Sequence, residues 1–570
     1  MTDGVTNGNQ LTGAEAMVKL LEAHDVDTVF GLCGDTSLPF YDALHRIGGS
    51  IRHVLTRDER SAGYMADAYA RVTGRIGVCE GPSGGGATYI LPALVEAGES
   101  SIPILAITTD IGVAGRGRYT LTELDQRLLF NPLTTYNEVI DTAEMLPRVV
   151  RRAFREATSG RCGSAHLGLP FDVQKAPVNE ADVWGDKRYG HFPATRSGPD
   201  PEEVETALRL ISDAKRPVFI CGGGVVIAGA EAALATLAEA FDAPVATTIS
   251  GQGSIADDHP LAVGVVGSNG GTVETRACVE AADLVVFVSC RAGSVTTERW
   301  RYPPVGTKIV HIDADAAVIG ANYPTDAVLV GDARLALEAM VKALPERPAN
   351  PERARAVRAE IADARARKAA RFLQLARSDE SPIRPERLIA SLYANTDPDT
   401  IIVADPGTPC PYFSAYYDMR QTGRTFISNR AHGALGYALA ASMGAAIGRP
   451  GVKTIAVSGD GSFAMGCGEL ETAVRLNLPI TFITISNSVF GWIKAGQKTG
   501  FNERYFSVDF SRTDHAAVAA GFGLKTFRVT DPADLDKTLK AAIAHQGPTL
   551  VDVICQPLQD AAAPVSEWVA

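Results

Sequence analysis

Short apolar runs alternate with alanine-rich segments along most of the chain. Examples of the apolar runs are DTVFGL at 27–32, LVVFVS at 284–289 and LPITFITIS at 478–486. Short runs of this kind, bounded by Gly, Pro, Ser or Asp, are typical of strands buried in a parallel sheet, and the alanine-rich segments between them favour helices. The alternation therefore predicts an α/β fold built from βα units.

The pattern is interrupted twice, by a polar stretch near 179–203 and by a strongly charged helical segment at 351–378. A chain of 570 residues is also too long for one core. We therefore expect three domains, each a doubly wound parallel sheet. The predicted boundaries are 1–185, 198–345 and 383–558 for the domains, 346–382 for a helical connector and 559–570 for a tail.

Composition narrows the functional classes. The net charge of −12 is small for this length and argues against a nucleic-acid partner. The nine cysteines are scattered, with no CxxC or other metal-binding spacing, which favours reduced thiols. No apolar stretch is both long and hydrophobic enough for a membrane span, and the polar N-terminus carries no signal peptide pattern. We expect a cytoplasmic protein with no membrane partner.

Candidate chemistry lies in two loops of the third domain. SGDGSF (458–463) follows one predicted strand, and SNS (486–488) follows the next one. The carboxyl ends of parallel strands meet at one edge of a sheet, so the two loops should be neighbours. A glycine-rich turn can present N–H groups to phosphate oxygens, and Mg²⁺ prefers oxygen ligands. Asp460, the Asn487 amide oxygen and a nearby backbone carbonyl could together hold Mg²⁺ on a diphosphate. The alternative for each loop alone is an ordinary turn.

This arrangement resembles the signature of thiamin diphosphate enzymes, a GDG turn followed at this distance by an Asn pair. Ser486 replaces the first Asn, and Asn487 keeps the second. The resemblance implies that Asp460, Asn487 and Val489 bind Mg²⁺, and that Leu435 is the apolar wedge that bends the cofactor. The cofactor contacts it implies are Glu59, Gly407, Thr408, Gly433, Leu435, Asp460, Gly461, Ser462, Asn487, Val489 and Gly491.

The same family needs a carboxylic acid against N1′ of the aminopyrimidine ring. The matching residue in TRDERSAGYMADAYARVTG (56–74) is Glu59, expected to be catalytic. The alternative is that Asp58 and Glu59 simply favour a helix start. Asp35 in GLCGD resembles the proton-donating acid of pyruvate-type decarboxylases, and its alternative is a helix cap.

The resemblance extends over nearly the whole chain, to acetolactate synthases and 2-oxo acid decarboxylases. It implies pyrimidine-binding, central and diphosphate-binding domains, and a homodimer or homotetramer with active sites at the subunit interface. FAD, ADP or no nucleotide remains open for the central domain. There GGGVVIAG (222–229) is not a clean GxGxxG, Arg291 matches an FAD contact, and Asp313 could hold a ribose.

The reaction is less closely defined. The lead hypothesis is decarboxylation of a 2-oxo acid with carboligation, as in acetolactate synthases, because Lys494 and Gln497 match them. Gly496 replaces their tryptophan, however, and Thr122 a glutamine. A simple 2-oxo acid decarboxylase is favoured by Asp35 but lacks the expected His-His pair. An acyl-CoA enzyme, resembling 2-hydroxyacyl-CoA lyase or oxalyl-CoA decarboxylase, is disfavoured by GDGSFAMGCG.

Overall fold

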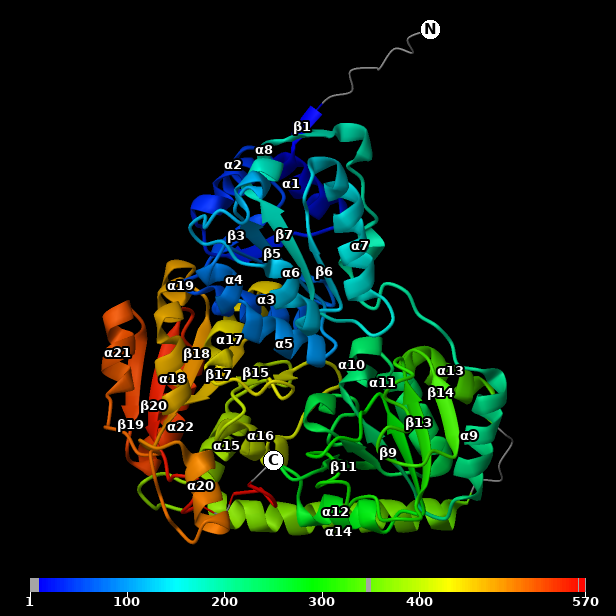
Figure 1. Cartoon of the computed structure of the whole chain (residues 1–570). Coiled ribbons are helices and arrows are strands. Elements are labelled where there is room, and N and C mark those ends of the chain that lie inside the picture. The colour runs from blue at the N-terminus through cyan, green and yellow to red at the C-terminus, as the bar shows by residue number, and fades with distance from the viewer. Residues whose placement is uncertain (1–9, 345–349, 562, 569–570) are drawn as a thin grey trace. The chain divides into compact units, whose positions relative to one another are not determined.

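The computed structural model describes residues 10–344, 350–561 and 563–568 (Figure 1). These residues form three six-stranded sheets in which every pair of neighbouring strands is parallel, beside one small two-stranded sheet. The predicted α/β class with three parallel-sheet domains is confirmed. The chain divides into two compact units, residues 1–195 with 443–449, and residues 196–442 with 450–570. The second predicted domain and the third, except for residues 443–449, therefore share one unit.

The first unit contains the N-terminal sheet, in the order β3-β2-β4-β5-β7-β6. Its strands are β2 (Thr28–Gly31), β3 (Arg52–Leu55), β4 (Gly77–Gly81), β5 (Ile104–Asp110), β6 (Tyr136–Val139) and β7 (Ala165–Pro170). The main helices around it are α1 (Gly13–Ala23), α2 (Leu38–Ile47), α3 (Glu59–Thr73), α5 (Leu91–Glu99) and α7 (Leu146–Thr158).

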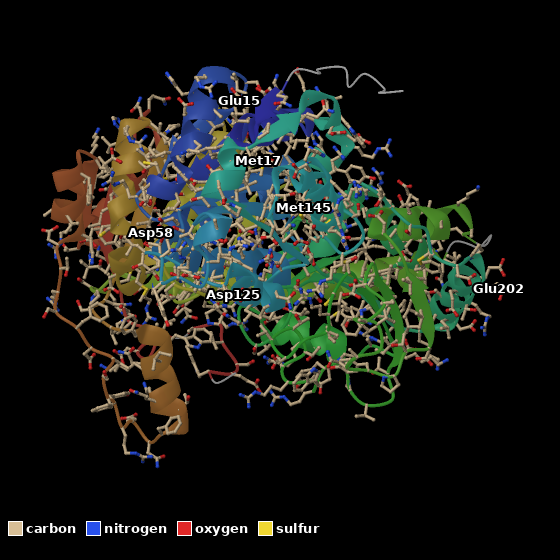
Figure 2. All side chains as sticks on the ribbon, turned by 45° about the horizontal axis from the view of Figure 1, so that its top comes forward. Glu15, Met17, Asp58, Asp125, Met145 and Glu202 are labelled. Atoms are coloured by element: carbon tan, nitrogen blue, oxygen red, sulfur yellow. The ribbon has the colours of Figure 1, made fainter. Side chains whose placement is uncertain are left out.

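Two of these helices show how the sequence sets their starts. Thr12 and Glu15 form a capping box at the start of α1, and Met17 of the same helix is fully buried (Figure 2). At α3 the cap is Asp58, whose side chain accepts the Ser61 N–H at 3.2 Å (Figure 2). Glu59 is therefore fixed as the first residue of α3.

The central sheet has the order β11-β10-β9-β12-β13-β14, with its first strand in the middle. This is the order of dinucleotide-binding folds. Its strands are β9 (Pro217–Cys221), β10 (Val245–Thr247), β11 (Ala262–Val265), β12 (Leu284–Val288), β13 (Lys308–Asp313) and β14 (Ala327–Val330).

Both faces of the central sheet are buried, which explains its continuous apolar strands. In β9, Phe219 and Cys221 enter one hydrophobic core, whereas Val218 and Ile220 enter another on the opposite face. Helices such as α11 (Glu231–Phe241) and α13 (Ala333–Lys342) cover the first face, and α12 (Val273–Glu280) contributes to the second. A strand buried on both sides reads as an unbroken apolar run, as the sequence pattern predicted.

The C-terminal sheet has the order β16-β15-β17-β18-β20-β19. Its strands are β15 (Ile401–Ala404), β16 (Phe426–Ile427), β17 (Thr454–Gly459), β18 (Ile480–Ser486), β19 (Lys525–Val529) and β20 (Thr549–Ile554). Counted along the chain, both the N-terminal and C-terminal sheets follow the order 2-1-3-4-6-5, whereas the central sheet follows 3-2-1-4-5-6. The first and third domains are thus alike in topology, and the central domain differs from both.

The charged segment after the central domain forms one long helix, α14 (Pro351–Ala376), whose buried residues are Ile361 and Ala376. It runs beside α12 (Figure 1), where Arg371 binds Glu274 through two hydrogen bonds of 2.7 and 2.9 Å. Residues 345–349, which include the predicted boundary between the central domain and the connector, lie outside the described residues. The domain boundaries themselves remain a prediction.

Of the predicted tail 559–570, residues 562, 569 and 570 lie outside the described residues, and the described ones contact both domains of the second unit. The Gly270 N–H donates to the Pro564 carbonyl at 2.9 Å, and the Ser566 N–H donates to the Ser268 carbonyl at 2.9 Å. Trp568 then packs on Trp492, with ring centroids 5.1 Å apart. The tail is therefore anchored on both the central and the C-terminal domain. Across the described parts of the chain, no helix is long and apolar enough to span a membrane.

Candidate active site

The structure brings Asp460 and Asn487 together at one edge of the C-terminal sheet. Asp460 opens α18 (Asp460–Gly466) directly after β17, and Asn487 follows β18, the neighbouring parallel strand. The Asp460 carboxylate accepts the backbone N–H groups of Asn487 at 2.7 Å, Ser488 at 2.6 Å and Gly461 at 2.9 Å. This carboxylate thus ties the two predicted loops to each other.

Asp460 is almost completely buried, with 3% of its surface exposed. Burial raises the pKa of the Asp460 carboxyl group, and the three backbone hydrogen bonds partly oppose this rise. The backbone donors and the nearby His515 offset only part of the cost of burying this carboxylate. A bound cation would compensate its charge further.

The remaining donors fit a Mg²⁺ site. The Asn487 Nδ2 atom is buried and has no hydrogen-bond partner among the described residues, so this amide is not committed elsewhere in the protein. Val489 pairs with Asp509 in a short bridge whose hydrogen bonds use the Ser488 carbonyl and the Phe490 N–H. That bridge leaves the Val489 carbonyl for another partner. A carboxylate, an amide oxygen and a carbonyl are the ligand types that Mg²⁺ takes.

The loops expected to contact the diphosphate are joined by a buried acid that sequence reasoning missed. Asp405, directly after β15, accepts the Ala438 N–H at 2.9 Å, and the nearby Ser462 hydroxyl lowers the pKa of its carboxyl group. Burial raises the pKa of Asp405 to about 6. Asp405 therefore links the segment before Gly407 to the segments that follow Leu435 and Asp460. Its place directly after an apolar run was the available signal.

The predicted wedge and phosphate residues lie in these same segments. A Cβ atom on Gly407 would lie 3.8 Å from the Leu435 side chain, so the two predicted contacts are neighbours. Gly433 adopts a positive φ of +73° in an exposed loop with open space around it. A Cβ atom on Gly461 would lie 2.6 Å from the Phe490 ring, which explains glycine there.

Three cofactor contacts implied by the resemblance remain. Thr408 stands directly before α16 (Pro409–Tyr416) and is 8% exposed. Gly491 begins α20 (Gly491–Gly500), and Val489 lies two residues before it. All three therefore lie in the segments that follow strands β15 and β18 of the C-terminal sheet.

Ser486, the departure from the family signature, forms a buried polar network of its own. Its hydroxyl donates to Asp552 and shares a hydrogen bond of 2.9 Å with His515 Nδ1. The His515 ring also packs edge-on against Phe463 of α18, with centroids 5.0 Å apart. The network fixes the end of β18 immediately before Asn487. Sequence reasoning missed it because its three members are far apart in the chain.

In the N-terminal domain, Glu59 is 5% exposed and bordered by two glycines. Cβ atoms on Gly81 and Gly86 would lie 3.1 Å from Glu59 Cγ and 2.9 Å from its Oε1. Burial raises the pKa of the Glu59 carboxyl group, and the charge of Asp58 adds to this rise. The group can therefore hold a proton closer to neutral pH than an ordinary glutamate.

Asp35 begins a short 3-10 helix (Asp35–Ser37) in the segment that follows β2, and it is exposed in this chain. Its Oδ1 accepts the Thr36 N–H at 2.9 Å, and the residue that precedes α2 is Ser37. Asp35 therefore does not cap α2, and the chain alone does not desolvate it. Its role as a proton donor remains a prediction. Thr122, at the position of the family's glutamine, shares a 2.7 Å hydrogen bond with Ser83.

The residues that match acetolactate synthases shape the loop after α20. Lys494 Nζ binds Asp509 at 2.6 Å, and Gln497 forms two hydrogen bonds with the backbone of Phe506, at 3.0 and 3.1 Å. A Cβ atom on Gly496 would lie 3.6 Å from the Trp568 carbonyl. The tail therefore lies where a larger side chain at position 496 would project.

The glycine-rich turn of the central domain is explained by protein contacts. A Cβ atom on Gly222 would lie 1.9 Å from the Ser289 carbonyl oxygen, and one on Gly224 2.4 Å from the Ser289 side chain. Arg424 donates to the carbonyls of Gly223 at 3.3 Å and Ser250 at 3.0 Å. These contacts favour the structural alternative for this turn over a nucleotide site.

Arg291 and Asp313, the other residues considered for a nucleotide, lie at the carboxyl ends of central strands. Asp313 ends β13, and its Oδ1 accepts the Asp315 N–H at 2.9 Å. Arg291 lies after β12, and its backbone carbonyl accepts a hydrogen bond from the Asn322 side-chain amide at 3.1 Å. Both residues have further interactions within the chain, so neither can be counted as free for a ligand.

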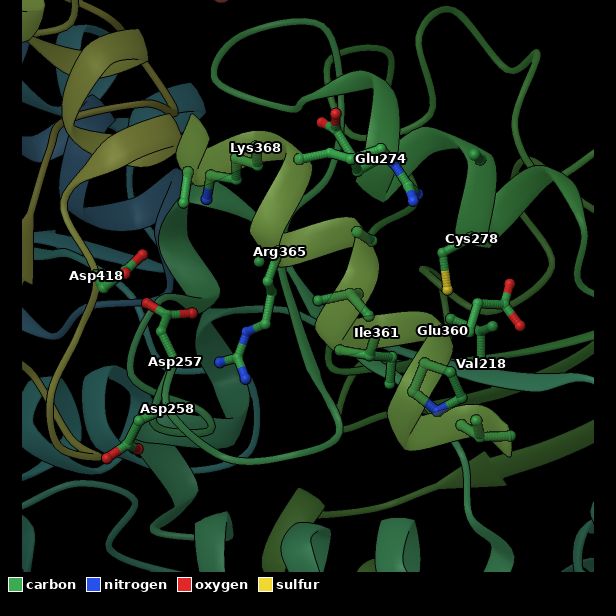
Figure 3. A pocket seen from close by; sticks show the side chains of 18 of the residues that line it. Val218, Asp257, Asp258, Glu274, Cys278, Glu360, Ile361, Arg365, Lys368 and Asp418 are labelled. Atoms are coloured by element: carbon green, nitrogen blue, oxygen red, sulfur yellow. The ribbon is translucent and has the colours of Figure 1, made fainter. Parts of the chain in front are cut away.

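A separate cavity of about 840 Å³ lies beneath α14 (Figure 3). Val218 of β9, Val263 of β11 and Ile361 of α14 are among its lining residues, and Arg365 reaches from α14 toward the loop of Asp257 (Figure 3). The cavity includes the amino-terminal starts of β9 and β10, whereas ligands of such sheets bind at the carboxyl ends. It is therefore distinct from the predicted nucleotide position, and none of the predicted site residues lines it.

Comparison with known proteins identifies the class. The chain matches the N-terminal thiamine pyrophosphate-binding domain at residues 11–129, the central domain of thiamine pyrophosphate enzymes at 204–340, and their C-terminal thiamine pyrophosphate-binding domain at 405–553. The chain belongs to the thiamine pyrophosphate-dependent enzymes.

Within that family its similarity is to acetolactate synthases. It is 34% identical over 566 residues to the probable acetolactate synthase large subunit of Methanococcus aeolicus, covering 96% of this chain and 92% of that protein. It is 33% identical over 557 residues to the acetolactate synthase large subunit of Corynebacterium glutamicum, covering 96% and 87%. The predicted resemblance is confirmed: this is an enzyme of the acetolactate-synthase-like group.

Proposed function

We propose that this enzyme uses thiamin diphosphate and Mg²⁺ to decarboxylate a 2-oxo acid and to join the product to a second carbonyl compound. The observation that carries the proposal is the Asp460 carboxylate, which binds the backbone of Asn487 and Ser488 and so gathers the predicted metal ligands. The near full-length similarity to proteins named acetolactate synthase supports the carboligation step.

In this proposal Asp460, Asn487 and Val489 hold the metal ion. Gly407, Thr408, Gly461 and Ser462 line the diphosphate, Leu435 is the apolar wedge, and Gly433 and Gly491 leave room for the cofactor. When bound, thiamin diphosphate supplies the electron sink for cleavage of the bond next to the carbonyl. Glu59 shares a proton with N1′ of the aminopyrimidine ring, and its raised pKa suits that role.

We further propose a cytoplasmic homodimer or homotetramer, in which the pyrimidine-binding domain of one subunit and the diphosphate-binding domain of another complete each active site. The family resemblance supports this assembly. FAD or ADP in the central domain is the less favoured part of the proposal, because contacts with Ser289 and Arg424 already explain the glycines at 222–224.

A second candidate is a simple 2-oxo acid decarboxylase that releases an aldehyde. The position of Asp35 favours it, because an acid at the carboxyl end of β2 stands at the edge where such sheets bind ligands. The two reactions differ only in whether a proton or a second carbonyl captures the intermediate.

The test is product analysis by mass spectrometry. The purified enzyme with thiamin diphosphate and Mg²⁺ is incubated with a panel of 2-oxo acids and acyl-CoA compounds, with and without a second carbonyl compound. The proposal expects CO₂ and a 2-hydroxyketone product from a 2-oxo acid, and no product from the Glu59→Gln variant. Aldehyde alone would support the second candidate, and conversion of acyl-CoA compounds alone would overturn both. Product that does not depend on thiamin diphosphate would overturn the cofactor role.

A further inference from the structure

A second buried carboxyl group stands beside Glu59 at the same edge of the N-terminal sheet. Glu80 is the penultimate residue of β4 and is 0% exposed. The next residue, Gly81, approaches Glu59 so closely that a Cβ atom there would lie 3.1 Å from Glu59 Cγ. The two acids therefore flank one glycine, and the proposed function gives no role to Glu80.

The surroundings of Glu80 contain hydroxyl donors. Tyr41 of α2 donates its hydroxyl to Glu80 Oε2 at 2.8 Å, and the Ser37 hydroxyl also interacts with this carboxyl group. Glu80 Oε1 is buried and has no hydrogen-bond partner among the described residues. On β2, a Cβ atom on Gly31 would lie 2.8 Å from Glu80 Oε2, so glycine there makes room for the acid. Such a site does not compensate an ionised carboxylate.

Of the titratable groups around Glu80 and Tyr41, Glu59 favours the neutral form of Glu80. The others are the thiols of Cys33 and Cys79 and the ring of His53, which packs edge-on with its centroid 4.8 Å from that of Tyr41. Burial and the Glu59 charge raise the pKa of Glu80 to about 8, although the two hydroxyl groups lower it. At neutral pH the pair Glu59 and Glu80 thus carries at most one negative charge in most molecules.

We propose that Glu80 is a positioning residue for Glu59, a neutral acid held by Tyr41 that leaves Glu59 free to share its proton with the cofactor. When Glu80 ionises at alkaline pH, its charge makes Glu59 hold its proton more tightly, because two close carboxylates resist joint ionisation. The inference rests on the proposed role of Glu59. Its consequence is an alkaline transition in the first proton transfer that Glu59 alone would not produce.

The first experiment follows exchange of the cofactor C2 proton in the loaded enzyme between about pH 6 and pH 9.5, a range that brackets the Glu80 transition. The wild type should show a transition near pH 8, relative to free cofactor, and Glu80→Gln should lose it. Tyr41→Phe should move the transition to higher pH, because it removes a donor that lowers the Glu80 pKa. Glu144→Gln, which removes an exposed carboxylate in the same domain, should keep the wild-type profile.

The second experiment needs no cofactor. Infrared difference spectra of the unloaded protein during a pH titration should show a protonated carboxyl band that disappears near pH 8 and is absent in Glu80→Gln. If Glu80→Gln does not fold, the test is whether Tyr41→Phe moves the pH at which this band disappears to a higher value. Equal exchange profiles or an unchanged band in these variants would overturn the inference. A Glu59→Gln variant with normal exchange would instead overturn the proposed function, which the infrared band does not test.

Discussion

Removal of the Asp460 carboxyl group should destabilise the metal-site loop, whereas removal of the Asn487 amide should not. Both variants, Asp460→Ala and Asn487→Ala, are expected to lose Mg²⁺-dependent binding of thiamin diphosphate. They should differ in the unloaded protein. Asp460 accepts three backbone N–H groups, whereas the Asn487 Nδ2 atom has no hydrogen-bond partner in the part of the chain that the structure describes.

The size of the difference follows from these contacts. A buried donor that loses its acceptor costs about 1–3 kcal/mol, and three donors are affected. Water reaches the half-buried Asn487 and Ser488, and the variant no longer buries a charge, so both effects reduce the total. We therefore expect local opening of residues 486–489 to become easier by about 3 kcal/mol in Asp460→Ala, a factor of about 100. Asn487→Ala should change it by less than about 0.5 kcal/mol.

Hydrogen exchange of the unloaded proteins, read by mass spectrometry on peptides that cover 486–490, measures this opening. Titration calorimetry measures cofactor affinity in the same samples. Asp534→Ala, which removes an exposed partner of Lys537 in the same domain, is the control for loss of an aspartate. Equal exchange in the Asp460 and Asn487 variants would refute the role given to the Asp460 hydrogen bonds. Unchanged cofactor affinity in both would refute the metal site.

Three further outcomes are expected. Ser486→Ala should accelerate hydrogen exchange at Asn487 and lower the free energy of unfolding by about 1–3 kcal/mol, because the buried Asp552 loses a hydrogen-bond donor. A melting temperature equal to that of wild type would contradict this. Because the Glu80 pKa is raised in the folded state, its contribution to stability is complete below about pH 4.5 and is lost as the pH rises through about 8. The loss in free energy of unfolding is at most about 5 kcal/mol, and thermal melting of Glu80→Gln at different pH values should not show it. Asp35→Asn should keep stability and cofactor affinity but lower the ratio of aldehyde to ligation product, and an unchanged ratio and turnover would remove its proposed role.

The sequence patterns predicted the fold class because parallel strands buried on both faces are unbroken apolar runs. They also led to Asp460 and Asn487, because chain order places both after adjacent strands. What they did not predict was the difference in strand order between the central domain and the other two. Strand order depends on which helices cross which face, and apolar periodicity does not encode that choice.

Contacts between distant residues were missed for the same reason. Asp405, the network of Ser486 with His515 and Asp552, and the Tyr41–Glu80 pair each join segments with no local motif. Of the three buried acids in these contacts, Asp405 directly follows an apolar strand, whereas Glu80 and Asp552 lie within one. A charged residue at such a position was the one local signal available.

The most direct test of the central claim is the C2 proton exchange of bound thiamin diphosphate in wild type and Glu59→Gln, measured by NMR after rapid quenching. The amide can still form a hydrogen bond to N1′, but it cannot share a proton with it. We expect Glu59→Gln to bind the cofactor and to exchange the proton at least about 100-fold more slowly. Wild-type exchange in a variant that binds the cofactor normally would contradict the catalytic role of Glu59.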